Sequence, residues 1–292
     1  MRVVDLWNDY ELLEVSDGER LERWGEYVLV RPDPQIIFNT KKTHPRWFSA
    51  DAYYHRSSSG GGFWEFKKQP PKDWTVTWND IIKLQVMLTS FKHTGVFPEQ
   101  GANWKIYMEM IEKAACSVEV LNLFGYTGAA SIACLKAGAT VCHVDASKGM
   151  IDVAKNNCSL SGVRDKPIRF IADDCKKFIK REIRRGKKYN AIIMDPPSYG
   201  RGPSGEKWKI EDDIYQLVLL SKDILVEEPL FFAINSYTAT LGPSVMQLIL
   251  SLVFTGYDGT VNCDEIGIPI ANTSLVIPAG STAMYITGTK GI

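Results

Sequence analysis

The chain has 292 residues, of which 45% are hydrophobic and 23% charged, the composition of an ordinary globular protein long enough for one large and one small domain. Lysine and arginine together number 34, as do aspartate and glutamate, so no net charge draws the whole molecule to nucleic acid or membrane, although a local basic patch could still bind RNA. No apolar run is long enough to span a bilayer, and the first ten residues lack the apolar core of a signal peptide.

The six cysteines and four histidines form no recognisable site. No two cysteines make a C-x-x-C pair, and most lie in apolar strand or helix patterns, where a free thiol behaves as a small buried hydrophobe. The histidines show no metal-ligand spacing, so the sequence predicts no metal. Reduced thiols favour a cytoplasmic protein over a secreted one, and the sequence does not indicate the oligomeric state.

The first part of the chain predicts a small β-rich domain over residues 1–79. Apolar and polar residues alternate in short bursts, and the apolar stretch Tyr27–Val30 runs into a turn at residues 31–34, where two prolines stand. Residues 57–62, Ser-Ser-Ser-Gly-Gly-Gly, are either a linker or the tip of a hairpin, because an aromatic run follows them directly. Residues 80–292 would then form the second domain.

The second part of the chain predicts an α/β domain. Alternating residues at 84–88 indicate one more strand, and a helical stretch follows at 102–115. From Ser117 onward, strands and helices alternate at the spacing of βαβ units, which predicts a parallel, Rossmann-like sheet. The expected strands are 118–123, 140–144, 168–172, 190–194, 230–235 and 283–287.

Residues of types that bind ligands follow four consecutive strands of this pattern. They are Gly125 and Gly128, Asp145, the pair Asp173-Asp174, and Asp195-Pro-Pro-Ser198. An open α/β sheet binds its ligands outside the carboxyl ends of its strands. One acid at one strand end would mean little, but four consecutive ends of this kind predict a nucleoside-cofactor site.

The spacing of the glycines and of Asp145 limits the kind of cofactor. Asp145 lies twenty residues beyond Gly125, about where an acid meets a ribose hydroxyl pair after one βαβ crossover. Alternatively, the glycines only turn the chain and Asp145 caps the helix that starts near Ser147. The dinucleotide pattern G-x-G-x-x-G would need three glycines, and Gly125 and Gly128 supply two at another spacing. This makes a nicotinamide dehydrogenase a distant alternative and favours a cofactor with an amino-acid tail.

A family resemblance rests on four motifs of the chain. They are Asn122-Leu-Phe-Gly-Tyr-Thr-Gly128, Val144-Asp-Ala-Ser147, Asp174 and Asp195-Pro-Pro197. These motifs resemble class I S-adenosylmethionine-dependent methyltransferases, and more narrowly the group of bacterial large-subunit ribosomal RNA methyltransferases that modify cytosine or guanine. Residues 94–100 resemble that group's extra motif, and residues 195–208 resemble a largely uncharacterised subgroup. The resemblance covers roughly residues 84–287, and no PUA module, which several relatives carry, is seen before it.

The resemblance implies a class I methyltransferase sheet, S-adenosylmethionine as cofactor and an RNA base, above all of ribosomal RNA, as substrate. Within it, Phe124–Gly128 would wrap the methionine part of the cofactor and Asp145 would bind the ribose. Asp174 would accept a hydrogen bond from the adenine amine, with Asp173 as the rival. The implied cofactor-binding residues are Phe97, Gln100, Asn122, Phe124, Gly125, Tyr126, Thr127, Gly128, Asp145, Ala146, Ser147, Asp174, Cys175 and Asp195.

The implied catalytic residues are Asp195, Pro196, Pro197 and Ser198. Prolines fix φ and expose carbonyls that no ladder uses, so Asp195 and a proline carbonyl could accept hydrogen bonds from an exocyclic amine. The methyl transfer is an in-line displacement, whose rate depends largely on positioning. The family's amine methyltransferases usually carry an aromatic residue after the second proline, where this chain has Ser198 and only then Tyr199. Amino methylation therefore stays open.

Methylation of a cytosine carbon would need a cysteine nucleophile. Relatives with that chemistry carry a cysteine after the fifth strand, and the corresponding residues 233–238, Ala-Ile-Asn-Ser-Tyr-Thr, contain none. This chemistry is disfavoured, with Cys263 as an outside candidate. Two further alternatives are a methyltransferase that acts on a protein or small molecule, which a neutral chain would fit, and a non-catalytic cofactor-binding homologue.

Basic residues occur in three places. The run at 180–188 is the densest, but it should end a helix far from the transferred methyl group, as a solvated helix end. Cations and aromatics that could hold phosphates and stack bases follow the double proline or lie near the N terminus, where they could equally form an aromatic core. They are Arg201, Lys207, Trp208 and Lys209, and Lys41, Lys42, His44, Arg46, Trp47, Phe48, Tyr53, Tyr54 and Arg56.

Overall fold

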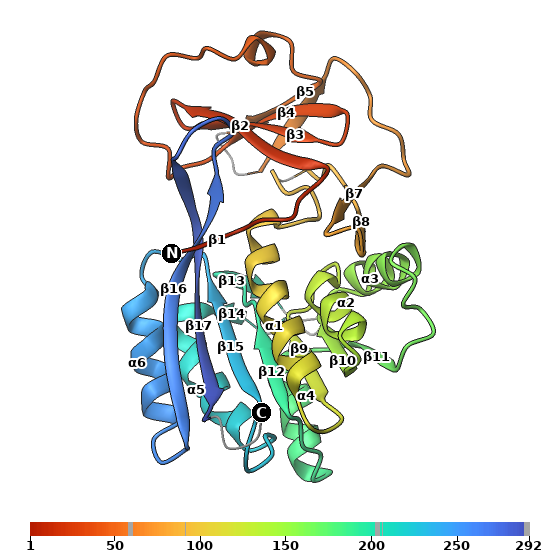
Figure 1. Ribbon diagram of the computed structural model, residues 1–292, viewed down its shortest axis with the longest axis vertical. Coiled ribbons are helices and arrows are strands. Elements are labelled where there is room, and N and C mark those ends of the chain that lie inside the picture. The colour runs from red at the N-terminus through yellow and green to blue at the C-terminus, as the bar shows by residue number, and fades with distance from the viewer. Residues whose placement is uncertain (58–60, 91, 202–204, 206, 289–292) are drawn as a thin grey trace. The chain divides into compact units, whose positions relative to one another are not determined.

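The computed structural model describes residues 1–57, 61–90, 92–201, 205 and 207–288 (Figure 1). The chain forms two compact units. The large unit comprises Met1–Arg2, Asn103–Ile266 and Ala279–Ile292, and the small unit comprises Val3–Ala102 and Gly267–Pro278. The borders of these units differ from the domain boundary expected after residue 79. The division into domains at residue 79 stays a prediction.

The large unit is built on an eight-stranded sheet with the order β1-β16-β17-β15-β12-β9-β10-β11. Its strands are β1 (Arg2–Val3), β9 (Glu119–Leu123), β10 (Thr140–Asp145), β11 (Ile168–Ala172), β12 (Ala191–Met194), β15 (Phe231–Ser236), β16 (Gly259–Pro269) and β17 (Val276–Thr287). The five strands from β15 to β11 pair in parallel, and β17 pairs antiparallel with β15. The parallel Rossmann-like sheet predicted from the sequence is confirmed.

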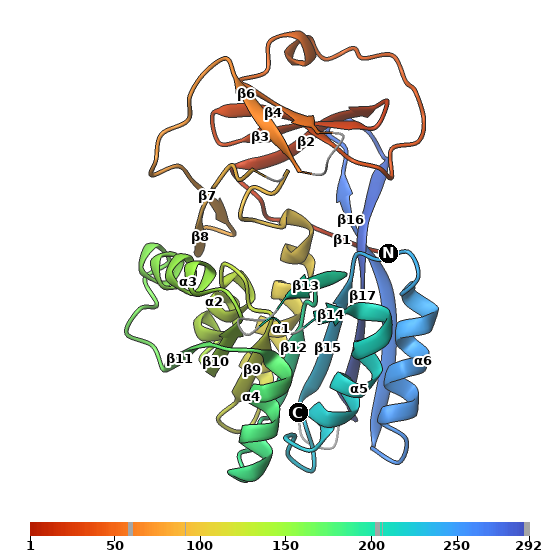
Figure 2. The ribbon, with the colours of Figure 1, turned by 180° about the vertical axis from the view of Figure 1, so that it is seen from behind.

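The helices of this unit are α1 (Gly101–Lys113), α2 (Ala129–Lys136), α3 (Lys148–Leu160), α4 (Cys175–Arg184), α5 (Ile210–Lys222) and α6 (Pro243–Val253). They cover both faces of the sheet, as the two neighbouring phenylalanines of β15 show. Phe231 stacks on Tyr107 of α1 with ring centroids 5.2 Å apart, whereas Phe232 packs against Phe254, which follows α6. Successive side chains of a strand point to opposite faces, and Figures 1 and 2 accordingly show α1 on one face and α5 on the other.

Two strands of the large unit differ from the expectation. Strand β16 was not predicted, and β17 begins at Val276 instead of residue 283. The first half of β16 is mostly exposed and lacks a regular apolar alternation, while Pro278 and Gly280 interrupt the pattern of β17. The local sequence of β16 and β17 gives only a weak strand signal. Their extent therefore depends on pairing with neighbouring strands of the sheet.

The small unit contains a five-stranded sheet and a separate hairpin. The sheet has the order β2 (Tyr10–Ser16), β3 (Glu19–Trp24), β4 (Tyr27–Pro32), β5 (Ala52–Arg56) and β6 (Gly62–Phe66), and the hairpin joins β7 (Thr75–Trp78) to β8 (Ile82–Gln85). Arg56 pairs with Gly62 across β5 and β6. Residues 58–60, at the centre of the stretch expected to be a linker or a hairpin tip, lie outside the described residues. The β-rich N-terminal region is thus confirmed.

Distant segments complete the small unit and explain why it extends past residue 79. The backbone N–H of Val86 donates to the carbonyl of Trp74, and the guanidinium of Arg31 donates to the carbonyl of Lys92. From the other end of the chain, the N–H of Ala271 donates to the carbonyl of Leu12 at 2.8 Å. No local pattern in the sequence predicts these long-range hydrogen bonds.

Candidate active site

Four strand ends meet at one edge of the large sheet. Leu123, at the end of β9, pairs with Val144 of β10 and with Met194 of β12, and Asp145 pairs with Ala172 of β11. The residues predicted from the sequence follow these ends directly, so the double-proline turn, the glycine turn and the two acidic ends lie side by side in that order. Phe97 and Gln100 belong to the small unit.

The glycine turn after β9 has an unusual backbone. Phe124 and Tyr126 have φ of 56° and 50°, and Gly128 has 89°. Positive φ is uncommon for residues other than glycine and persists where surrounding structure enforces it, often at functional sites. The N–H of Gly125 donates to the carbonyl of Val144 at 2.9 Å, which ties the turn to β10. This turn presents its backbone at the sheet edge.

A buried polar chain supports the turn from below. The amide of Asn122 donates to the Ser131 hydroxyl at 2.9 Å, and that oxygen lies 2.9 Å from Nδ1 of His143. All three residues are buried, and burial lowers the pKa of His143 to about 4, so the ring is neutral near pH 7. A Cβ at Gly125 would overlap the His143 ring, which is why this position requires glycine. The structure thus places Asn122, a predicted cofactor residue, beneath the turn.

Asp145 fastens the turn to the next helix. One carboxylate oxygen accepts the N–H of Tyr126 at 2.8 Å, and the other accepts the N–H of Ser147 at 2.8 Å. Burial raises the pKa of Asp145, and the two N–H groups act in the opposite direction. The alternative that Asp145 caps α3 is wrong, because the Ser147 hydroxyl accepts the N–H of Met150 in the cap position. Each oxygen of Asp145 keeps a second lone pair that could accept a further hydrogen bond.

The acids after β11 have different surroundings. Both oxygens of Asp173 are engaged, one by the N–H of Asp174 and the other by Arg181. Asp174 caps α4 with one oxygen, which accepts the N–H of Lys177 at 2.8 Å. The N–H of Cys175, the first residue of the helix, has no acceptor within the helix. Asp174 and the N–H of Cys175 thus place one acceptor and one donor side by side after β11, and the choice between Asp174 and Asp173 as the adenine partner stays a prediction.

The double-proline turn after β12 continues into a hairpin that the sequence did not predict. Pro196 is buried, while Pro197 and Ser198 are exposed and Asp195 is half-buried. The hairpin joins β13 (Tyr199–Arg201) to β14 (Lys207–Lys209). The N–H of Ile210, where α5 begins, donates to the Ser198 carbonyl at 3.0 Å and closes the hairpin back onto the turn.

Trp208 lies inside this site, although the sequence grouped it with surface cations. Its indole Nε1–H donates to the carbonyl of Pro197 at 2.6 Å. Its ring centroid lies 5.1 Å from that of Phe124, with the ring planes tilted by 51°. Nothing in the local sequence around Trp208 indicates that its ring turns toward Phe124. This orientation depends on the pairing of β13 with β14.

A second buried polar cluster was also missed. The amide of Asn103 in α1 donates to Thr282 at 2.8 Å, and the hydroxyl of Thr282 donates to Asn235 at 2.7 Å. All three side chains are at most 2% exposed. The only signal for it in the sequence is the polar residue Asn235 at the end of an apolar strand. The cluster joins α1, β15 and β17 where β15 ends.

Of the predicted residues, Phe97 is the N-cap and Gln100 the last residue of a short 3-10 helix of the small unit, η2 (Pro98–Gln100). Gln100 is buried and Phe97 half-buried, with its ring 5.6 Å from that of His93. Their predicted role, to close over the cofactor, stays a prediction.

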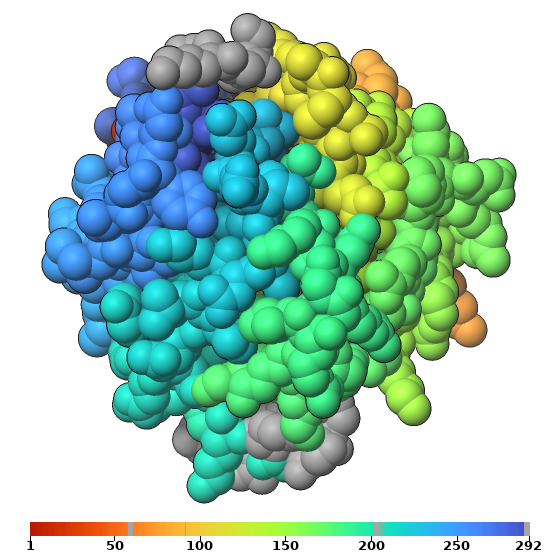
Figure 3. All heavy atoms as spheres, turned by 90° about the horizontal axis from the view of Figure 1, so that it is seen from below, coloured from red at the N-terminus to blue at the C-terminus, as the bar shows by residue number. Residues whose placement is uncertain are grey.

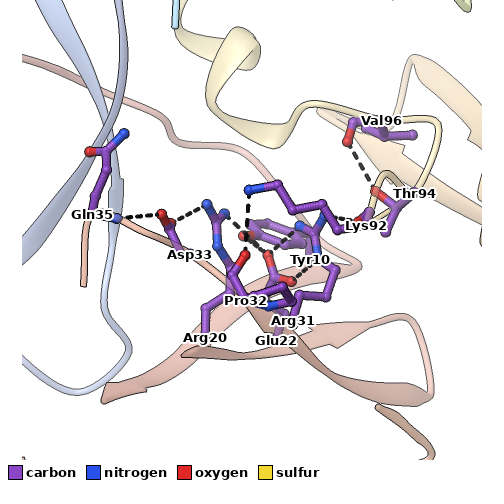
Figure 4. A network of polar contacts seen from close by, with 10 residues as sticks. All are labelled: Tyr10, Arg20, Glu22, Arg31, Pro32, Asp33, Gln35, Lys92, Thr94 and Val96. Atoms are coloured by element: carbon purple, nitrogen blue, oxygen red, sulfur yellow. Dashed lines mark hydrogen bonds and ion pairs between the residues drawn. The ribbon is translucent and has the colours of Figure 1, made fainter. Parts of the chain in front are cut away.

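A buried ionic network of the small unit holds Lys92, which lies just before residues 94–100 (Figure 4). Arg31 binds both oxygens of Glu22 and donates to the carbonyl of Lys92 at 2.9 Å. Burial favours the neutral form of Glu22. The charges of Arg31 and Arg20 and the hydrogen bonds from Arg31 outweigh this and lower the pKa of Glu22 to about 2. Arg20 in turn pairs with Asp33. Because a buried charge that loses its partner is costly, this network fixes Lys92 and the segment after it to the small sheet.

The basic run at 180–188 lies away from the site, as the sequence predicted. Lys187 forms an ion pair with Glu119, the first residue of β9, at the edge of the sheet opposite the glycine turn. Figure 3 shows the large unit from the end at which the parallel strands begin. The aromatic residues of the N-terminal region divide: Trp47 and Tyr54 are buried in the small unit, whereas Phe48 is exposed.

Two classes of feature are not found among the residues that the structure describes. No three or more histidine, cysteine, aspartate or glutamate side chains gather in a way that could hold a metal ion. None of the described helices combines the length and apolar character that crossing a membrane requires.

Comparison with known proteins agrees with this architecture. A family model described as S-adenosylmethionine-dependent methyltransferase matches residues 43–246, more than half of the chain. The crystal structure of an S-adenosylmethionine-dependent methyltransferase from Agrobacterium tumefaciens is 33% identical, with 98% of this chain and 93% of that chain covered and a TM-score of 0.93.

Curated relatives match about half of the chain. Ribosomal RNA large subunit methyltransferase I of Aeromonas salmonicida is 30% identical over 132 residues, and methyltransferase K/L of Shewanella frigidimarina is 32% identical over 133 residues. Each match covers 45% of this chain, but only 32% of the first relative and 18% of the second. The chain therefore spans only a minor part of either relative.

Proposed function

The chain belongs to the S-adenosylmethionine-dependent methyltransferase family, and from this premise we propose that it methylates a base nitrogen of ribosomal RNA. The observation that carries the proposal is the meeting, at one sheet edge, of the glycine turn, the acids after β10 and β11, and the double-proline turn with its hairpin. An rRNA substrate would place the protein in the cytoplasm.

The strand ends fit the cofactor, S-adenosylmethionine, which supplies an electrophilic methyl carbon when bound. The backbone of Phe124–Gly128 would hold the methionine part, because Gly125 presents no side chain there. Asp145 would accept the ribose hydroxyls, and Asp174 with the N–H of Cys175 would bind the adenine edge. These roles follow the hydrogen-bonding capacity that each residue retains in the structure.

The double-proline turn would orient the accepting nitrogen. Asp195 and the carbonyl of Pro196 are the proposed acceptors for an exocyclic amine, because the carbonyl of Pro197 already accepts a hydrogen bond from Trp208. Two such bonds would direct the nitrogen lone pair at the methyl carbon. The nitrogen–carbon bond forms as the sulfur–carbon bond breaks, and the proton leaves the nitrogen toward Asp195 or water.

The surroundings of the thiols argue against a covalent route to a cytosine carbon. Residues 195–198 and 233–238 contain no cysteine. Burial raises the pKa of Cys175, and burial raises the pKa of Cys263 to about 11, so neither thiol is poised as a thiolate near pH 7. Nitrogen methylation therefore fits this site better than carbon methylation.

The outer face of the hairpin supports RNA as the substrate. Tyr199 pairs with Lys209, and Arg201, whose side chain lies outside the described residues, pairs with Lys207. Directly paired residues project to the same face of a hairpin, so Tyr199 and the two lysines share one face, and the Tyr199 side chain is exposed. Cations beside an exposed aromatic ring are typical of surfaces that bind single-stranded RNA. The names of the curated relatives point to the same substrate class.

The test is transfer of labelled methyl from S-adenosylmethionine to undermodified ribosomal RNA, with total protein and small metabolites assayed in parallel. We expect label in RNA, and nucleoside analysis of the digest should show an N-methylated base. Label only in protein or metabolites would reject RNA as the substrate. A wild-type protein that binds S-adenosylhomocysteine but labels no fraction would indicate a non-catalytic homologue.

A further inference from the structure

The Trp208 side chain contacts both the double-proline turn and the glycine turn. Trp208 donates its N–H to the carbonyl of Pro197 in the double-proline turn, and its ring packs on Phe124 in the glycine turn. Gly200 lies opposite it on β13, and a Cβ added there would make ordinary contacts, 3.5 Å from Cγ of Pro197 and 4.0 Å from Cβ of Trp208. The surface lysines of the same hairpin project from its other face.

We propose that Trp208 is a positioning residue with two separable functions. Its N–H fixes the direction of the Pro197 carbonyl and, with it, the Asp195–Ser198 turn that orients the substrate. Its ring holds Phe124, and with it the cofactor turn. The first function rests on the proposed methyl transfer, whereas the second depends only on cofactor binding.

The geometry explains why each turn needs this support. Residues 196 and 197 are prolines without an N–H, so the turn cannot fasten itself through their backbone donors. A short hydrogen bond from a half-buried indole provides the missing anchor. Phe124 has φ of 56°, a conformation that a residue with a side chain keeps only where neighbours enforce it. The aromatic contact with Trp208 supplies part of that enforcement.

Two substitutions separate the functions. Trp208→Phe keeps a ring against Phe124 but removes the N–H, so we expect the affinity for S-adenosylhomocysteine to stay within about twofold of wild type. The kcat for RNA methylation should fall about tenfold with little change in KM, because a misaligned turn affects the transition state more than binding. Trp208→Ala should show the same loss of kcat and also bind S-adenosylhomocysteine about three- to tenfold more weakly.

The control is Trp64→Phe. Trp64 also donates its indole N–H to a backbone carbonyl, that of Thr89 at 2.8 Å, but it belongs to the small unit. This variant should match wild type in S-adenosylhomocysteine affinity and in kcat. A tenfold loss of kcat in both tryptophan variants would show that any lost indole bond has this effect, and would overturn the specific assignment.

The outcomes distinguish this inference from the proposed function. A wild-type protein that does not methylate RNA refutes the proposed substrate, and calorimetry with S-adenosylhomocysteine still tests the ring contact. An active wild type with an unchanged kcat in Trp208→Phe refutes the role of the N–H. If Trp208→Ala lowers the melting temperature severely, Phe124→Leu tests the contact from the other side. A Phe124→Leu variant that binds S-adenosylhomocysteine within about twofold of wild type would refute the ring contact.

Discussion

The two halves of the sheet edge are built differently. The glycine turn after β9 is fastened to the neighbouring strand: the N–H of Gly125 donates to the carbonyl of Val144, and Asp145 accepts the N–H groups of Tyr126 and Ser147. The double-proline turn is more exposed, and its anchors come from a hairpin that returns about ten residues later. The proposed cofactor half is therefore held by the pairing of β9 with β10, while the proposed substrate half depends on the hairpin that follows it in the chain.

The largest expected effect separates chemistry from cofactor binding. Asp195→Asn removes the proposed charged acceptor from the substrate half, so the kcat for methyl transfer should fall about a hundredfold or more. The affinity for S-adenosylhomocysteine, measured by calorimetry, should change by less than about threefold, because Asp195 would touch the cofactor only at its reactive end. Equal losses of binding and transfer would contradict the division of the site into two halves.

The next effect concerns the cofactor half. Asp145→Ala removes both the proposed ribose acceptor and the anchor of Tyr126, so affinity for S-adenosylhomocysteine should fall about a hundredfold. Asp145→Asn keeps one acceptor oxygen of similar placement and should show a smaller loss in the same calorimetric titration. Near wild-type binding by Asp145→Ala would show that the ribose is held elsewhere.

Acid should lower the free energy of unfolding through His143, which lies beneath the glycine turn. The pKa of the buried ring is about 4, below the value near 6.5 in an unfolded chain, so the unfolded state binds more protons between these values. Stability is therefore lost as pH falls through this window, by about 2 kcal/mol between pH 7 and pH 5 for this group. Urea unfolding of wild type and His143→Asn at both pH values measures the difference. Identical pH slopes would show that His143 does not titrate as its burial requires.

The smallest effect tests the outer face of the hairpin. Lys207→Ala should raise the KM for RNA about two- to fivefold and lower the slope of log affinity against log salt by about one, the effect of one lost phosphate contact. Lys207→Arg, which keeps the charge, should resemble wild type. An unchanged salt slope in Lys207→Ala would place the RNA on another surface.

The strand ends beside the glycine turn were predictable because their signals are local. Strands 118–123 and 140–144 are mostly apolar, and each ends in a glycine turn or an acid within two residues. Parallel pairing then brings those ends together without further information. The role of Asn122 in cofactor binding stays a prediction, and in the structure its amide donates to Ser131 beneath the turn.

The sequence by itself determined the parallel sheet, the residues that follow its strand ends and the family of the protein. The tertiary structure alone decided that Trp208 turns inward, that β16 extends the sheet, and that residues 267–278 complete the small unit. The physical reason is the range of the interactions. Hydrophobic periodicity and turn residues act within a few positions of the chain, whereas these three features depend on hydrogen bonds and ring contacts between segments whose local sequences do not require them.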